Sequence, residues 1–440
     1  MIAALSSTLT RWCQRWIPDG YVIAAVLTVL ILSVALVATP HGPAALAEQW
    51  GKGFWGFIPF TLQMSMVILT GFVVAEAPPV QRALATLAAQ PRTATQAVAL
   101  TALTAMALAW LNWGLGIVAA AVLARRVGER RIADFRVLVA SSYLGMGCTW
   151  HAGLSASAPL TSSDASQGFV KQYLGGAVPV TDTIFSLPNL ALVLVTMVVM
   201  TLVAVRAHPH AESYDGPEPE APPPPPAPPR TPAERLERAW WLNGVFVALV
   251  AWSTYAELRD GGLARLNINH VNLLFFGLGA LLHPSPASLL AAAERGGRNV
   301  WGVLVQFGLY AGIAGVLDKS GLAAQLADVF VRVASPQTFP LLVVWYSGLL
   351  NYVMPSGGAK WFIELQYLAE ASRTLGVPMS TTVMAYAWGD MLTDLIQPFW
   401  AIPMLAVVRL GFRDIMGICA VMFVVYAALV SVAFAAWGFL

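Results

Sequence analysis

Long apolar runs separated by short polar stretches dominate this chain. Nine of the runs approach the roughly 20 residues that a helix needs to cross a bilayer. We expect these spans at roughly 20–39, 55–77, 134–156, 184–205, 239–257, 269–283, 300–318, 381–404 and 415–439. The pattern therefore predicts an all-α polytopic membrane protein with about nine transmembrane helices.

A further apolar run is interrupted near its middle by Asn112, Gly114 and Gly116. Arginines bound this run on both sides, and arginines near membrane spans favour the cytoplasmic face. Both ends should therefore lie on one face, which predicts a re-entrant helical hairpin at about 95–125. Arg11 and Arg15 precede the first span, which we expect to be uncleaved. Because arginines near a span favour the cytoplasm, the N-terminus should lie there.

A second interrupted run, at about 338–375, contains the breaker sequence "MPSGG". Between the two runs lies a Pro-rich polar segment, 206–238, which we interpret as a cytoplasmic linker. The single span at 239–257 then carries the chain out of the cytoplasm. The second hairpin should therefore enter the membrane from the opposite face.

The two halves, 1–205 and 258–440, share residues in the same order. Trp55 recurs as Trp301 and Asn112 as Asn351, with similar offsets. This order predicts inverted-topology repeats, in which ligands bind near the membrane midplane where broken helices of both copies meet. Chance similarity among apolar segments is the alternative.

Composition agrees with a membrane location and excludes several functions. The chain has 440 residues, of which 58% are hydrophobic and 11% charged, and its net charge of +2 indicates no nucleic-acid or acidic partner. The three cysteines lack the spacing of a disulfide framework or a metal site. We expect no metal and no cofactor.

Four breaks in apolar segments carry the candidate chemistry: the two hairpin tips and the interrupted spans at 150–160 and 388–400. Unpaired backbone groups there persist only where protein or a water-filled cavity satisfies them. Free N–H groups suit a carboxylate, whereas free carbonyls and Asn or Thr oxygens suit a small cation. We predict substrate-binding roles for Asn112, Trp113, Gly114, Gly116, Ser155, Ser157, Asn351, Pro355, Ser356, Gly357, Gly358, Lys360, Trp361 and Gln397, with Met354 as an apolar wall.

Charges near these breaks are the second signal. Lys360 and Glu364 stand four residues apart on one helical face, and Asp390 and Asp394 have the same spacing. The first two residues pair with each other or bind substrate; an aspartate carries protons or binds a cation. The ion-coupling candidates are Asn112, Asn351, Thr393, Asp390 and Asp394.

Two other functions remain open. His151 and Ser155, four residues apart, would fit an intramembrane hydrolase, but a broken helix rarely preserves that geometry, so we do not expect an enzyme. An ion channel is the other alternative.

At these motifs the chain resembles the short-chain fatty acid transporter family, which includes bacterial acetoacetate and butyrate uptake proteins and is similar to the broader ion transporter superfamily. The resemblance runs nearly end to end. It rests on "FWGF", "QMSMVILTG", "NWGLGIV", "VPVTDTIFS", "NHVNLLFFGLGALLH", "VQFGLYAGI", "MPSGG", "QPFWAIP" and "GFRDIMG".

The resemblance implies cation-coupled uptake of a small monocarboxylate, with H⁺ or Na⁺ as the coupling ion. It also implies an elevator-type homodimer in the bacterial inner membrane. The family is expected to continue "MPSGG" with Gly-His-Trp, where this chain has Ala359, Lys360 and Trp361. This departure leaves room for a longer acid, a hydroxy or keto acid, or a carboxylate that also bears an amine.

Overall fold

The computed structural model describes residues 20–208, 216–218 and 228–438, and all the regular secondary structure in these ranges is helical. Arg11, Arg15 and about half of the Pro-rich segment (209–215 and 219–227) lie outside the described residues. The first half contains α2 (Gly20–Ala38), α3 (Pro43–Gly56), α4 (Ile58–Glu76), α5 (Pro78–Ala89), α6 (Ala94–Leu111), α7 (Trp113–Gly128), α8 (Phe135–Cys148), η1 (Trp150–Ala152), α9 (Ser157–Ser162), η2 (Val170–Leu174), η3 (Val180–Asp182) and α10 (Leu187–Arg206).

The second half begins with the short α11 (Pro232–Glu237), which lies within the segment predicted as a linker. It continues with α12 (Trp240–Leu258), η4 (Gly262–Arg265), α13 (Ile268–Leu282), α14 (Pro286–Gly297), α15 (Trp301–Ser320), α16 (Leu322–Val333), α17 (Phe339–Val353), α18 (Gly357–Leu375), α19 (Met379–Met391), η5 (Asp394–Ile396), α20 (Ala401–Val408) and α21 (Phe412–Trp437).

Among the described residues, six helices are long and apolar enough to cross a membrane: α2, α4, α6, α10, α15 and α21. Five of them coincide with expected spans. The sixth, α6, was expected as one arm of a re-entrant hairpin, so re-entry stays a prediction. The expected span at 269–283 is the 15-residue helix α13, and the spans at 134–156 and 381–404 are each divided by a break.

The predicted breaks are present, and local chemistry explains them. The first separates α6 from α7 at Asn112, whose side-chain oxygen accepts a hydrogen bond from the Leu115 N–H at 2.9 Å and so caps α7. The second separates α17 from α18 at residues 354–356, where Pro355 supplies no N–H to continue the helix. Backbone N–H groups that have no acceptor within their own helix therefore lie at the starts of α7 and α18.

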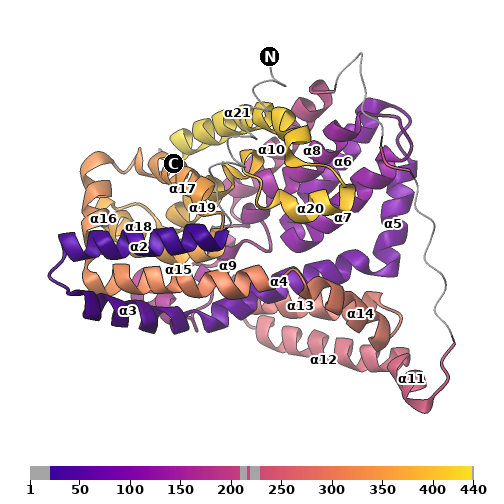
Figure 1. Ribbon diagram of the computed structural model, residues 1–440, viewed down its shortest axis with the longest axis horizontal. Helices are drawn as coiled ribbons and strands as arrows, with labels where there is room; N and C mark the ends of the chain where they lie inside the picture. The colour runs from indigo at the N-terminus through magenta and orange to yellow at the C-terminus, as the bar shows by residue number, and fades with distance from the viewer. Residues whose placement is uncertain (1–19, 209–215, 219–227, 439–440) are drawn as a thin grey trace.

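The helices form two packed groups (Figure 1). In one group, α2 and α3 lie beside α15, and α12 and α13 pack near α4. In the other, α6 packs against α7 and α8, and α17 packs against α19. The helices α7 and α18 connect the groups, since α7 contacts α4 and α18 contacts α15. Both are largely buried, which places the two tips inside the protein.

Candidate functional site

A small cavity lies where the four breaks meet. Its volume is about 20 Å³, enough for about one water molecule. The lining residues come from α4, α8, α15 and all four breaks: Met64, Trp113, Met146, Trp150, Ser157, Val303, Phe307, Ser356, Gly357, Gly358 and Trp400. Convergence of the breaks on one space is the arrangement expected of a binding site at mid-membrane.

Several hydrogen-bond donors lie among the mostly apolar residues that line this cavity. The first N–H groups of α18, beginning at Gly357, have no acceptor within their own helix because the helix starts there. The buried indole Nε1 of Trp113 has no hydrogen-bond partner. With the hydroxyls of Ser157 and Ser356 on the same wall, these groups form a lining suited to a carboxylate.

A cluster of buried charged side chains lies behind the cavity wall. Lys360, fully buried on α18, places its Nζ 2.9 Å from Asp390 Oδ1 and 3.3 Å from Glu364 Oε1. The same Nζ donates to the backbone oxygen of Ser347 at 2.8 Å, and Ser347 donates its hydroxyl hydrogen to Glu364. The predicted pairing of Lys360 with Glu364 is therefore present, but Asp390 is the closer partner.

Asp394 lies apart from this cluster, among polar side chains. It forms no ion pair with the described side chains. Its carboxylate accepts hydrogen bonds from Asn351 Nδ2 at 2.8 Å, Trp150 Nε1 at 3.1 Å and Gln397 Nε2 at 3.4 Å. Thr393 hydrogen-bonds to Asn351 as well. Four of the predicted residues thus form one group, next to the cavity rather than on its surface.

The first tip is held by different contacts. The Ser155 hydroxyl accepts a hydrogen bond from the Trp113 N–H at 2.8 Å, so it braces the tip. Gly116 lies against Ala109, where a Cβ would approach the Ala109 Cα to 2.6 Å, so this glycine permits close packing of α6 on α7. The amide Nδ2 of Asn112 is buried without a partner.

The second tip also contains residues that do not reach the cavity. Trp361 is buried, donates to the Ser162 hydroxyl at 3.1 Å and packs against Tyr386. Met354 and Pro355 are buried but do not line the cavity. Of the residues predicted to bind substrate, the cavity surface contains Trp113, Ser157, Ser356, Gly357 and Gly358.

Sequence reasoning missed the bridging role of His151. This buried imidazole contacts Asp390 Oδ2 through Nδ1 at 2.8 Å and Ser157 Oγ through Nε2 at 2.9 Å. The sequence contained one signal for this role, because His151 lies inside the predicted break at 150–160. Its serine partner is Ser157, whereas the four-residue spacing in the sequence pointed to Ser155.

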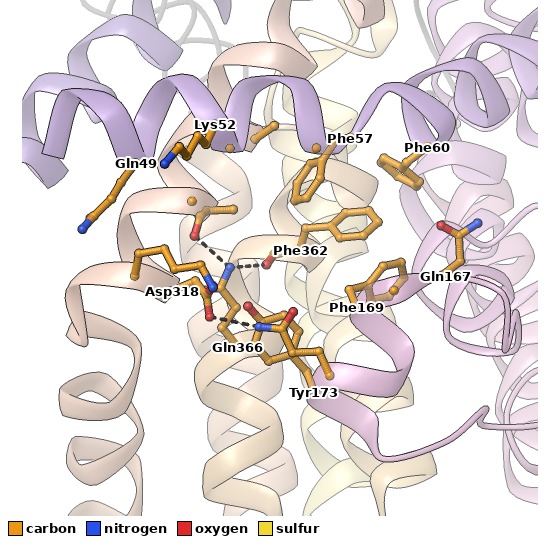
Figure 2. A pocket seen from close by; sticks show the side chains of 18 of the residues that line it. Gln49, Lys52, Phe57, Phe60, Gln167, Phe169, Tyr173, Asp318, Phe362 and Gln366 are labelled. Carbon is orange, nitrogen blue, oxygen red and sulfur yellow. Dashed lines mark hydrogen bonds and ion pairs between the residues drawn. The ribbon is translucent and has the colours of Figure 1, made fainter. Parts of the chain in front are cut away.

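A second, larger pocket of about 1000 Å³ opens between α3, α15, α18 and the segment around η2 (Figure 2). Figure 2 shows the rings of Phe57, Phe60, Phe169 and Phe362 gathered at one side of it. The Phe60 ring also stacks on Phe307 of the small cavity, with centroids 5.6 Å apart. Aromatic side chains thus form the partition between the large pocket and the small cavity.

The fold defines a class of protein, that of all-helical, multi-pass membrane proteins. The structure is similar to that of the YdaH transporter of Alcanivorax borkumensis, with a TM-score of 0.60 and 16% identity over 96% of this chain and 98% of that chain. It is equally similar to MtrF of Neisseria gonorrhoeae, which is described within a class of antimetabolite efflux pumps. That match has a TM-score of 0.60 and 15% identity over 99% of this chain and 97% of MtrF.

Sequence comparison gives the family. A protein of Escherichia coli K12, provisionally named as a short-chain fatty acid transporter, is 36% identical over 95% of this chain and 96% of its own length. A relative in Haemophilus influenzae with the same provisional name is 31% identical over 95% of this chain and 96% of its own length. The model of the short chain fatty acid transporter family matches residues 1–436. The chain belongs to this family, whose members are transporters and not enzymes.

Family membership decides how the Ser157, His151 and Asp390 contacts are interpreted. Their order is that of a serine hydrolase triad. However, the Ala158 N–H also donates to His151 Nε2, at 3.1 Å, so the lone pair that a general base needs is shared with the backbone. The geometry is therefore poorly suited to nucleophilic attack by Ser157.

Proposed function

We propose that the protein is a secondary active transporter that takes up short-chain fatty acids or related small monocarboxylates, such as butyrate and acetoacetate. The observation that supports this most strongly is the cavity itself. Unpaired donors line it, and it lies between the two helix breaks at Asn112 and at residues 354–356. A small anion is the ligand that such donors favour.

The lining suggests how each part of such a substrate is held. The carboxylate lies against Ser356, Ser157, the Trp113 indole N–H and the free N–H groups at the start of α18. The acyl chain lies against the apolar side chains of Met64, Met146, Val303 and Phe307. These groups form a short apolar wall, which favours short acids.

Binding requires the cavity to open, because its present volume accommodates only about one water molecule. In an alternating-access cycle, the tips of the two halves move in turn and open the cavity first to one side of the membrane and then to the other. Equivalent helices of the two halves pack in the same way, which supports inverted repeats. In the first half α4 contacts α7 and α6 contacts α8; in the second half α15 contacts α18 and α17 contacts α19. The re-entrant hairpins, both broken helices and the domain limits predicted from the sequence are part of this proposal.

The two packed helix groups support an elevator-type movement. We infer that the group containing α6–α8 and α17–α19 carries the substrate, while the group containing α2–α4, α12, α13 and α15 forms a scaffold that dimerises. The N-terminus is cytoplasmic in this arrangement, and the membrane is the bacterial inner membrane.

Movement of an anion through lipid calls for a compensating cation, H⁺ or Na⁺. The Asp394 group, with Asn351, Thr393 and Gln397, supplies a carboxylate and neutral oxygens for this purpose, and Asp390 supplies a second carboxylate. Asn112 is the corresponding candidate at the first tip.

Uptake of labelled butyrate and acetoacetate into proteoliposomes, with pH and sodium gradients imposed separately, tests the proposed function. Protein-free liposomes set the baseline, because short acids cross lipid in their neutral form. We expect saturable uptake above this baseline, and about a tenfold loss in Ser356→Ala, the equivalent of one hydrogen bond to a charged group. Ser33→Ala, which changes a side chain that bonds only within α2, is the matched control.

Uptake that fails to saturate would indicate a channel. Absence of accumulation under either gradient, with folded protein in the membrane, would refute the substrate assignment. Equal uptake by Ser356→Ala and Ser33→Ala would remove Ser356 from the site.

A further inference from the structure

His151 connects the cavity to the buried charges. It lies in η1, between α8 and α9, and its side chain is fully buried. One ring nitrogen faces Ser157 on the cavity wall, and the other faces Asp390 behind it. Trp150, which lines the cavity, also contacts an acidic side chain, but its indole only donates to Asp394, whereas the imidazole of His151 can both accept and donate.

The hydrogen bonds fix the protonation state of this ring. A backbone N–H only donates, so the bond from the Ala158 N–H to His151 Nε2, at 3.1 Å, makes Nε2 an acceptor. The ring is therefore neutral, with its hydrogen on Nδ1, where it is donated to Asp390 Oδ2 at 2.8 Å. The Ser157 hydroxyl, 2.9 Å from Nε2, then also donates to the ring. In this state two donors beside the cavity are directed away from any substrate.

We propose that His151 is the proton-binding residue that couples H⁺ to the substrate carboxylate. A proton on Nε2 turns this atom from an acceptor into a donor. The Ser157 hydroxyl loses its acceptor and becomes free to donate to a carboxylate in the cavity, and the imidazolium places a positive charge behind it. Proton and anion therefore favour each other's binding. This inference rests on the proposed function and specifies its coupling ion.

The charges around His151 favour an added proton. Asp390 contacts the ring directly, and Lys360 neutralises only one carboxylate while Asp390 and Glu364 both approach it. Trp150, which donates to Asp394, stacks on His151 with centroids 4.2 Å apart. Two carboxyl groups, of Asp390 and Glu364, thus share one ammonium group, and an imidazolium beside Asp390 reduces this excess of acidic groups.

The remaining neighbours add no opposing charge. The helices α6 and α9 contain no charged residue. On α8, Arg136 lies at the far end and pairs with Asp134, and Tyr143 and Cys148 are neutral near pH 7. On α19, the Tyr386 ring lies 5.7 Å from the imidazole and donates its hydroxyl hydrogen to the Gly357 oxygen.

Linkage makes the inference quantitative. Suppose that one proton binds with each anion. At pH values where His151 of the free protein is neutral, the affinity for the carboxylate then rises about tenfold for each unit by which the pH falls. The reverse also holds, because bound anion raises the affinity for the proton by the same factor.

Binding of butyrate to the detergent-purified protein, followed by calorimetry between about pH 6 and about pH 8.5 where butyrate stays ionised, tests this directly. We expect the dissociation constant to rise steeply with pH in the unmodified protein and to be independent of pH in His151→Gln. His283→Gln is the matched control, because His283 is also buried and bonds through both ring nitrogens, to Ser288 and to the Val73 oxygen. It should keep the full pH dependence.

Ser157→Ala provides a second variant that removes only a hydroxyl group. It should weaken binding at low pH by about tenfold and keep the slope, because the imidazole remains. A pH-dependent dissociation constant in His151→Gln, or a flat profile in the unmodified protein, overturns the inference.

Flux measurements separate this inference from the proposed function. A pH-sensitive dye should report about one proton entering with each anion in the unmodified protein. His151→Gln should exchange labelled for unlabelled butyrate yet fail to accumulate it under a pH gradient. Accumulation driven by sodium alone would overturn the role of His151 and leave the proposed function intact. Absence of both butyrate and acetoacetate binding at every pH would refute both proposals.

Discussion

The buried lysine offers the most direct test of the energetics of the fold. Replacing Lys360 with Met keeps an unbranched side chain of similar length and removes the ammonium group. Its two carboxylate partners, at 2.9 Å and 3.3 Å, each attract it by roughly 5 to 6 kcal/mol at an effective dielectric constant of about 20. Desolvation offsets much of this attraction, so the net loss is about 3–5 kcal/mol, the usual consequence of leaving a buried charge without its partner.

The exposed pair of Lys52 and Glu48 is the matched control. Its atoms are closer, at 2.6 Å, but its side chains are 76% and 66% exposed. The hydrogen bond to Lys52 lowers the pKa of Glu48. Because solvent screens an exposed ion pair, this pair contributes little to the stability of the folded protein. If burial rather than distance decides the contribution, Lys52→Met should leave the stability unchanged.

Thermal unfolding in detergent at one fixed scan rate measures both variants. We expect Lys360→Met to lower the apparent Tm by roughly 5 °C or more, and Lys52→Met to leave it unchanged. The triple variant Lys360→Met, Glu364→Gln, Asp390→Asn should recover part of the loss, because no buried carboxylate is then left unpaired. Equal Tm values for the two lysine variants would refute the reasoning, and so would a triple variant less stable than Lys360→Met.

Three further predictions concern the tips. Asn351→Leu removes the 2.8 Å hydrogen bond to Asp394 and should lower uptake about tenfold at an unchanged protein level; unchanged uptake would assign Asn351 a structural role only. Trp113→Phe deletes the unpaired indole N–H and should weaken butyrate binding severalfold in calorimetry while Tm stays within about 2 °C; equal affinity would place the carboxylate elsewhere. Gly116→Ala should destabilise by about 1–3 kcal/mol because its methyl group would meet Ala109, whereas Gly244→Ala, in open space, should not; similar Tm values would contradict the tight packing of α6 on α7.

Sequence patterns located the helices and breaks well where the determining chemistry is local. Apolar length placed α2, α4, α10, α15 and α21, and Asn112 and Pro355 marked the breaks because capping and the missing N–H act within a few residues. The family resemblance was also confirmed, over residues 1–436.

The composition of the site depended on packing between distant segments. Asp390 meets His151 across 239 positions, and Trp150 meets Asp394 across 244. Helical spacing correctly placed Glu364 beside Lys360, but it carries no information about a partner on another helix. It also left Ser155 and Ser157 equivalent, although one braces the tip and the other faces the cavity.

The sequence by itself therefore determined that this is a helical membrane protein whose helices are interrupted at known positions, since periodicity and helix breakers act over a few residues. The tertiary structure decided which side chains surround the cavity and which charge compensates which. Those choices arise when separate helices pack together, and a buried charge is stable only beside the partner that packing provides.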